Sequence, residues 1–211
     1  VFTAILALTL FASHAQNIPG KKSVLKTMRL ANKYFMNKRP NPGDSITTNI
    51  TRPANIWTRA VYYEGLMALY AIDKKKAYYN YAVDWGAKHN WNLRGGVQTR
   101  NADNQCAGQT YIDLYLMDPQ PHRIEKIKRS IDSMMRTDRI NDWNWVDAIQ
   151  MAMPVFAQLG VIYKEPAYWE RMYQMYMFTR NNHGVKGVFN PADDLWWRDR
   201  DFDPAYKEPN G

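Results

Sequence analysis

The chain has 211 residues, of which 45% are hydrophobic, and a mean hydropathy of −0.58, so it has the composition and the length of a globular protein with a sizeable core. Its 28 Lys and Arg residues against 20 Asp and Glu give a net charge of +8, which favours anionic partners. The longest basic run, Lys74–Lys76, stands at the start of an expected helix and belongs to no basic stripe interleaved with aromatic residues, so nucleic acid is disfavoured as a partner.

The beginning of the chain has the pattern of a secretory signal. Residues 1–12 are almost entirely apolar, and a small-x-small cleavage site ending at Ala15 follows them. The run is too short to span a bilayer, and it lacks the basic leader and the initiator Met, so the signal looks clipped at its start. We therefore expect residues 1–15 to be removed, residues 16–211 to form the folded domain, and the product to be periplasmic or extracellular with no membrane association.

The remaining sequence predicts helices and almost no strands. The first two are expected at about 21–37 and 53–72, with a loop rich in Pro and Asn between them. After residue 182 the helical period is lost, and a long loop with a short hairpin is expected. The other helices are expected at about 75–90, 103–117, 122–137, 142–160 and 166–181, with Gly160 as the stop signal of the sixth.

Two kinds of helix alternate along the chain. The third, fifth and seventh carry one apolar stripe each, as surface helices do, whereas the second, fourth and sixth are apolar on more than one side. This alternation indicates two concentric layers of helical hairpins, an α/α barrel; a plain bundle or a solenoid are the alternatives, although no sequence repeat supports a solenoid. The stripes are Tyr78, Tyr81, Ala82 and Trp85 in the third helix, Ile124, Ile127, Ile131 and Met134 in the fifth, and Tyr168, Met172 and Met175 in the seventh.

Such layering brings the beginnings of the inner helices to one mouth of the barrel, because antiparallel alternation makes all inner helices run the same way. Several helix N-termini that face one cavity favour anions. Polar residues cluster in the segments that lead into these helices: Arg52, Asn55, Arg59, Arg100, Asn101, Asp103, Asp142, Asn144 and Asp147. An aromatic-walled mouth of this kind suits an acidic sugar.

The most apolar helix begins with the stretch Asp142–Ala148. Its first turn carries Asp147, which follows Trp143 and Trp145 closely in the sequence. Burial disfavours a charged carboxylate and raises its pKa, which is how a general acid is made to work near neutral pH. The alternative is that Asp147 complements the helix macrodipole, which lowers an acid's pKa, and spacing alone leaves both open.

One cysteine cannot form an internal disulfide, so Cys106 is expected to be a free thiol that packs as a small hydrophobe. The four histidines show no ligand spacing. The sequence therefore predicts no metal and no cofactor, and it leaves the oligomeric state open.

Several motifs together resemble one enzyme family. They are Trp57 with Tyr62–Leu66, Asp103–Gln105 with Gly108–Tyr111, Trp145–Ala148 with Met151 and Ala152, Trp196–Asp199, and Tyr206–Gly211. Over residues 21–211 the chain resembles glycoside hydrolase family 105, the unsaturated rhamnogalacturonyl hydrolases, which are related to the family 88 unsaturated glucuronyl hydrolases.

The resemblance implies an (α/α)6 barrel and a reaction on 4,5-unsaturated galacturonate at the non-reducing end of pectin-type oligosaccharides. It implies that Asp147 protonates the double bond and activates water, that Asp103 supports Asp147 and binds sugar hydroxyls, and that Tyr63 and Trp145 are stacking or wall residues.

Trp197 and Arg198 match a segment that binds and recognises the substrate in the family. Many family members carry a His there, and this chain has none. The family domain also continues beyond residues 210–211, so the chain is expected to be the N-terminal part of the barrel and inactive by itself.

Two other functions remain possible from the sequence. An (α/α)6 sugar epimerase or polysaccharide lyase would keep the fold, although the shortage of histidines argues against these enzymes. An inactive, carbohydrate-binding fragment is the non-enzymatic alternative.

Cleavage of the signal predicts that the exported protein begins at or near Gln16. N-terminal sequencing of secreted material checks this, and an intact apolar run on that material would contradict it.

Overall fold

The computed structural model describes residues 18–182 and 187–202. The expected signal, residues 1–15, and the tail motif, residues 206–211, lie outside the described residues. The chain divides into two units, residues 1–38 and 39–211. The first unit contains helix α1, Lys21–Lys38, which carries a basic residue in its last turn, where a cation complements the helix dipole.

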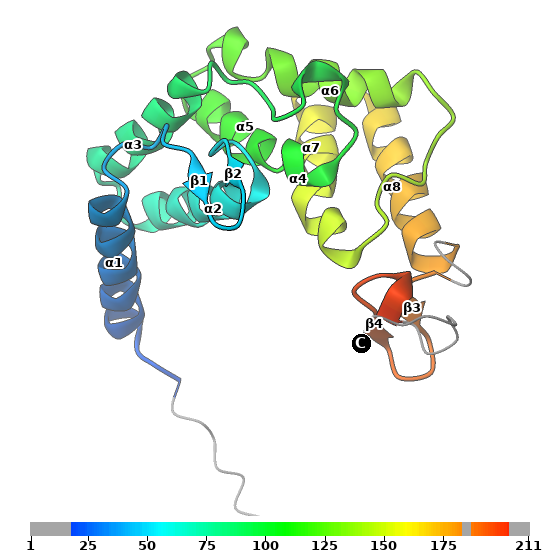
Figure 1. Ribbon diagram of the computed structural model, residues 1–211, viewed down its shortest axis with the longest axis horizontal. Helices are drawn as coiled ribbons and strands as arrows, with labels where there is room; N and C mark the ends of the chain where they lie inside the picture. The colour runs from blue at the N-terminus through cyan, green and yellow to red at the C-terminus, as the bar shows by residue number, and fades with distance from the viewer. Residues whose placement is uncertain (1–17, 183–186, 203–211) are drawn as a thin grey trace, which may run out of the picture. The chain divides into compact units, whose positions relative to one another are not determined.

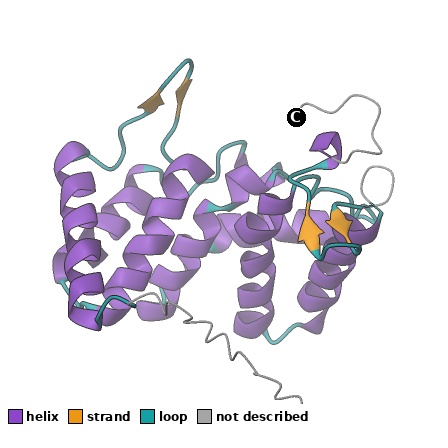
Figure 2. Cartoon of the chain, turned by 90° about the horizontal axis from the view of Figure 1, so that it is seen from below, coloured by secondary structure: helices purple, strands orange, loops and turns teal. Residues whose placement is uncertain are grey.

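The second unit is built of helices and two short hairpins (Figures 1 and 2). One hairpin pairs β1, Ile46–Thr47, with β2, Thr51–Arg52, and the other pairs β3, Phe189–Asn190, with β4, Leu195–Trp196, as expected after residue 182. The helices are α2 (Trp57–Ile72), α3 (Lys76–Lys88), α4 (Ala102–Gln105), α5 (Ala107–Met117), α6 (Glu125–Met135), α7 (Val146–Tyr163) and α8 (Pro166–Asn181), with short 3-10 turns at Gly96–Gln98, Pro121–Arg123 and Arg200–Phe202.

The helices form the two layers that the apolar patterns predict. In the inner layer α2 packs against α5, and α5 packs against α7. In the outer layer α3 covers α2 and α5, α6 lies over α5 through Ile127, and α8 covers α7. The predicted outer stripes are buried, except that Met172 is only partly covered. The all-α fold and its layering are therefore confirmed.

Three aromatic side chains in contact join helices of both layers. Tyr63 of α2 stacks on Trp85 of α3 with ring centroids 4.0 Å apart, and Tyr111 of α5 lies 5.3 Å from the same indole. All three side chains are completely buried. The indole N–H of Trp85 also donates to the Ala54 carbonyl at 3.1 Å, which ties the segment before α2 to this core. Burying rings of this size stabilises the contact between α2, α3 and α5.

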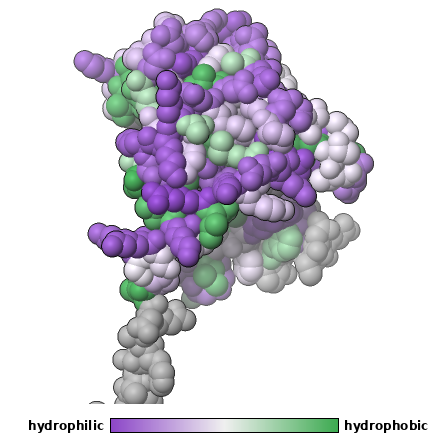
Figure 3. All heavy atoms as spheres, turned by 90° about the vertical axis from the view of Figure 1, so that its left-hand side faces the viewer, coloured by the Kyte–Doolittle hydropathy of each residue, from purple (hydrophilic) through white to green (hydrophobic). Residues whose placement is uncertain are grey.

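Hydrophilic residues cover most of the side on which α3 lies, as an outer layer of amphipathic helices requires (Figure 3). The inner helices, in contrast, leave apolar side chains exposed. Val61 of α2 is 39% exposed, Leu116 of α5 is 56% exposed and Val161 of α7 is 67% exposed. Within the described residues, α7 alone is long and apolar enough to cross a membrane, but core helices pass the same test, and α7 packs between α4, α5 and α8.

Helices α2 and α7 begin about four residues later than predicted, and two further differences concern a break and an end. The expected fourth helix is divided at Cys106 into α4 and α5. Helix α7 continues past Gly160 to Tyr163 and ends at Lys164, which has a left-handed backbone with φ of 53°. Gly160 is required for packing, because a Cβ there would lie 2.5 Å from the indole nitrogen of Trp169 in α8. The glycine thus allows α7 and α8 to approach closely and does not stop the helix.

Two glycines provide a matched test of this packing. A Cβ on Gly108 of α5 would lie 2.4 Å from Ile127, whereas a Cβ on Gly65 of α2 would meet no atom within 4 Å. We expect Gly108→Ala to lower the free energy of unfolding by about 1–3 kcal/mol through overpacking. Gly65→Ala should raise it by about 0.5–1 kcal/mol, because alanine is the better helix former. Chemical denaturation measures both, and a neutral Gly108→Ala would contradict the close contact of α5 and α6.

Candidate active site

A pocket of about 540 Å³ lies where the inner helices begin. Trp57 opens α2, Asp103 lies in α4, and Asp147 lies in the first turn of α7. The predicted gathering of these N-termini at one mouth is therefore observed. The lining residues are Trp57, Asp103, Asn144, Trp145, Asp147, Arg198, Asp199, Arg200 and Asp201.

The segment after β4 forms the far wall of the pocket, and it is fixed to the beginning of α7. The backbone N–H of Val146 donates to the Arg198 carbonyl at 2.7 Å, and Trp145 and Asp199 form an antiparallel β-bridge. This pairing satisfies one of the free N–H groups at the start of α7. It also places Arg198 and its neighbours opposite Asp147.

The surroundings of Asp103 in the pocket raise the pKa of its carboxyl group. Its side chain is half-buried, and burial raises its pKa above the usual value for aspartate. The negative charge of Asp147 raises this pKa further, while Arg94 and Arg52 oppose the shift. The pKa of Asp103 thus responds to the charge of Asp147 in the same pocket.

Asp147 differs from the expectation of a buried acid. The residue is exposed, although Trp145 beside it is half-buried and Trp143 is completely buried against Phe156. The argument from burial therefore applies to Asp103, which is half-buried. Among residues 18–182 and 187–202, no hydrogen bond or ion pair holds the Asp147 carboxylate, which leaves it accessible to a ligand.

Four carboxylates and two guanidinium groups line the pocket. Arg198 pairs with Asp199 at 2.5 Å, and Arg200 lies 3.5 Å from Asp201. The lining is therefore not the cation-rich mouth that the sequence suggested. The side chains of Arg198 and Arg200 are nevertheless 62% and 54% exposed, so each guanidinium can still meet an anionic group in the pocket.

Two of the predicted substrate contacts lie away from this lining. Tyr63 is completely buried in the aromatic core, so the structure gives it a packing role and no access to a sugar. Trp197 is half-buried, and its backbone N–H donates to the Val188 carbonyl at 2.8 Å. Trp145 and Arg198 do line the pocket, as do both predicted carboxylates. Their roles with a substrate remain predictions.

The residue-by-residue prediction missed Arg200 and Asp201. Their signal in the sequence was the alternation of charge in Arg198–Asp201, which follows a pair of tryptophans.

Of the polar residues predicted at the mouth, some line the pocket and others do not. Asn144 reaches the pocket, but Arg100 and Asp142 pair with each other behind it, and Asn55 is buried with its amide donating to the Asn92 carbonyl.

Cys106 lies below the pocket as a completely buried free thiol. It contacts Glu64 of α2 at 3.0 Å, and burial together with that carboxylate raises the thiol's pKa well above its ordinary value. The group is therefore protonated and unreactive, as expected of a packed cysteine. Within the described ranges, no cluster of three or more His, Cys, Asp or Glu residues could hold a metal ion.

Comparison with protein families gives the relationship of the chain. The model of glycosyl hydrolase family 88 matches residues 27–211. The chain belongs to glycosyl hydrolase family 88. The match includes every residue that lines the pocket.

Individual relatives agree with this family. An unsaturated 3S-rhamnoglycuronyl hydrolase of Formosa agariphila is 24% identical over 174 residues, which are 73% of this chain and 44% of the relative. A family 88 glycosyl hydrolase from Bacteroides vulgatus has a similar fold, with a TM-score of 0.74 and 24% identity over 87% of this chain and 53% of that chain.

A polysaccharide lyase also shares the fold, with a TM-score of 0.74 and 23% identity over 86% of this chain and 51% of the lyase. At these identities the two solved structures establish the fold alone. The chain spans about half the length of the relatives it matches.

The raised pKa of Asp103 predicts a pH-dependent change in stability. A carboxyl whose pKa is higher in the folded state than its unfolded value of about 3.9 destabilises the fold increasingly as pH rises above that value, and the penalty is complete above the folded pKa. Asp103→Asn removes this penalty, so we expect its melting temperature to exceed that of the wild type at pH 7. The difference should shrink as pH falls through the folded pKa and vanish well below the unfolded value of about 3.9, where the carboxyl is protonated in both states. Thermal unfolding across this range measures it, and a lower melting temperature of the variant at pH 7 would contradict the pKa shift.

Proposed function

We propose that this chain carries the catalytic residues of a hydrolase that removes 4,5-unsaturated galacturonate from the non-reducing end of rhamnogalacturonan or pectin oligosaccharides made by lyases. The observation that supports it most is the pair Asp103 and Asp147, which reach one pocket from two neighbouring inner helices, where the charge of Asp147 helps to raise the pKa of Asp103. Membership of family 88 supports the hydrolase class.

The reaction needs one proton donor that can also act as a base. Asp147 in its acid form gives a proton to C4 of the double bond, and a water molecule adds its oxygen to C5. The Asp147 carboxylate then accepts the proton that this water loses, which restores the acid. The product is a hemiketal that opens and releases the next sugar. The exposure of Asp147 suits this role, because both the sugar and the water must reach the carboxyl.

Asp103 supports this acid in two ways. Its raised pKa keeps a proton on Asp103 to higher pH than on an isolated aspartate, so the pocket holds a protonated carboxyl of the kind that the first step requires. Its carboxyl also lies in the wall of the pocket, where it can bind sugar hydroxyls. The two groups are therefore proposed to share the proton, with Asp147 delivering it to the substrate.

The other lining residues fit an aromatic-walled site for a uronate. Trp57 and Trp145 supply indole surface on which a sugar ring can stack. Arg198 and Arg200 supply exposed guanidinium groups for the uronate carboxylate, which can be bound through two parallel hydrogen bonds. These contacts would select an unsaturated uronate over a neutral sugar.

The finer specificity, that of family 105, is part of this proposal. The relative from Formosa agariphila is named for an unsaturated glycuronyl group joined to rhamnose, which supports a rhamnose unit next to the uronate that this enzyme removes. The sequence motifs shared with family 105 point to the same arrangement, with galacturonate as the unsaturated sugar.

The activity can be followed by ultraviolet absorbance, because hydration destroys the conjugated double bond that lyases create. The full-length protein, incubated with lyase-digested rhamnogalacturonan, should lower this absorbance and release a product that ends in rhamnose, while saturated galacturonides remain intact. A rise in absorbance would identify a lyase instead. Unchanged absorbance with several unsaturated uronides would exclude the proposed hydrolase.

Carboxyl variants test the two assignments. Asp147→Asn should lower kcat by about 10²–10⁴-fold, the usual contribution of general acid–base catalysis, without changing the helical circular dichroism. Asp103→Asn should lower kcat and weaken substrate binding. Asp113→Asn is the matched control, because Asp113 also has a pKa raised by burial but hydrogen-bonds to Gln158 outside the pocket lining. A loss of less than tenfold in Asp147→Asn would remove Asp147 from the mechanism.

A further inference from the structure

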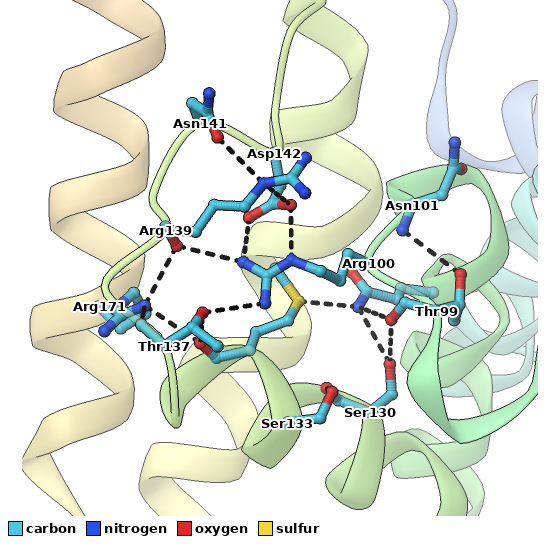
Figure 4. A network of polar contacts seen from close by, with 12 residues as sticks. Thr99, Arg100, Asn101, Ser130, Ser133, Thr137, Arg139, Asn141, Asp142 and Arg171 are labelled. Atoms are coloured by element: carbon cyan, nitrogen blue, oxygen red, sulfur yellow. Dashed lines mark hydrogen bonds and ion pairs between the residues drawn. The ribbon is translucent and has the colours of Figure 1, made fainter.

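An ion pair outside the pocket lining joins the two loops that lead into the helices carrying the proposed catalytic carboxylates. Arg100 precedes Asp103 in the loop before α4, and Asp142 precedes Asp147 in the loop before α7. The Arg100 guanidinium bonds both carboxylate oxygens of Asp142, from Nε to Oδ1 at 2.8 Å and from Nη2 to Oδ2 at 2.6 Å. Figure 4 shows this two-point contact crossing from one loop to the other.

The loop before α7 is held firmly around this contact. The Asp142 side chain is only 1% exposed, and Arg139 approaches it at 3.1 Å from the other side. Arg100 also donates to the Thr137 hydroxyl and the Arg139 carbonyl, both at 3.2 Å. Arg171 of α8 donates to the carbonyls of Met134, Thr137 and Arg139, which fixes the same loop to the outer layer (Figure 4).

The loop before α4 is anchored as well. The Thr99 carbonyl accepts from the Ser130 hydroxyl at 2.8 Å and from the Gln105 amide at 3.2 Å, and Ser130 belongs to α6. Arg100 therefore extends from a fixed backbone. Since hydrogen bonds anchor both ends of the ion pair, its two-point geometry limits how far the loops can shift or rotate against each other.

The energetics suggest a geometric role for this pair. A buried ion pair contributes little net stability, because desolvation of the charges offsets their attraction. The two hydrogen bonds between the guanidinium and the carboxylate nevertheless have a well-defined length and direction. Each loop leads directly into a helix whose first turn carries one of the two carboxyls on which the proposed chemistry depends, Asp103 in α4 and Asp147 in α7. A shift of about 1 Å between reacting groups can cost about 10²-fold in rate.

We propose that Arg100 and Asp142 form a positioning pair that sets the separation and orientation of Asp103 and Asp147 for the reaction. The proposal rests on the function proposed above. Neither member lines the pocket, so the pair acts through the two loops and does not touch the substrate.

A positioning role has a signature in the titration of Asp103. Its pKa is raised by burial and by Asp147 and is lowered by Arg94 and Arg52. If the two loops drift apart, the contribution of Asp147 falls and the pKa of Asp103 moves down toward its ordinary value. The other charged groups that face the pocket are Arg198, Asp199, Arg200 and Asp201 of the segment after β4, and the variants below leave them unchanged.

The test uses Arg100→Lys in the full-length protein. Lysine keeps the charge but cannot bond two carboxylate oxygens in a planar fork. We expect kcat to fall about tenfold with KM changed less than twofold, as for a misplaced catalytic group. Carboxyl ¹³C NMR, with the Asp103 signal assigned from Asp103→Asn, should show a lowered pKa. Asp142→Asn should give the same two effects and serves if the lysine variant does not fold.

Arg123→Lys is the matched control. Arg123 pairs with Asp118 at 2.7 Å, so this pair too has one buried member, here the arginine, but it lies at the C-terminal end of α5, away from the loops that lead into the pocket. It should lower the melting temperature about as much as Arg100→Lys does, with kcat and the pKa of Asp103 unchanged.

Two outcomes would overturn the positioning role. One is an unchanged kcat and an unchanged pKa of Asp103 in folded Arg100→Lys or Asp142→Asn, which would leave the pair a purely structural contact. The other is an equal loss of kcat in Arg123→Lys. If the wild type turns over no unsaturated uronide, the proposed function fails, and the pKa of Asp103 in the variants still decides whether the pair positions the carboxyls.

Discussion

The site depends on the common direction of three apolar helices. Helices α2, α5 and α7 pack side by side in the inner layer, and the amphipathic helices α3, α6 and α8 cover them. Because each inner helix is followed by an outer one that runs back, every inner helix begins at the same end of the layer. The hydrophobic requirement to bury apolar faces thus determines where the polar residues before these helices meet. The pocket lies at that end, with Trp57, Asp103 and Asp147 in its wall.

The two carboxyl groups of this pocket differ in how far they are exposed to solvent. Asp103 lies in the short helix α4, which packs on α7, and burial raises its pKa. Asp147 projects from the first turn of α7 and is exposed. One group is thus suited to hold a proton and the other to exchange it with a ligand. The pairing of Val146 with Arg198 adds the arginine-bearing wall opposite them, so all the proposed chemistry lies within one pocket.

Local sequence patterns could predict the layers but not the contacts between distant residues. The stripe of Ile127, Ile131 and Met134 has the helical period, so its burial follows from the sequence. Gly160 looks like a stop signal, yet its role is to accommodate Trp169 of α8, which no local pattern shows. Tyr63 belongs to a shared motif but stacks on Trp85 in the core, since only the packing of α2 on α3 decides which way its ring points.

The same limit applies to the charged residues of the site. The position of Asp147 in the first turn of α7 was predictable, but its exposure depends on how the segment after β4 is placed. The ion pair of Arg100 and Asp142 joins residues far apart in the chain, and only the packed structure shows it. Both residues had been expected at the mouth because they precede inner helices. Each instead finds an oppositely charged partner behind it, where burying an unpaired charge would be costly.

The crystal structure of full-length Asp147→Asn with an unsaturated rhamnogalacturonan disaccharide would test the proposed site most directly. This variant should bind the sugar without consuming it. We expect the double bond of the uronate to lie between Asn at position 147 and Asp103, with the ring against Trp145 and its carboxylate at Arg198 or Arg200. A disaccharide bound elsewhere on the protein, or bound with its double bond out of reach of both positions, would contradict the assignment of this pocket as the active site.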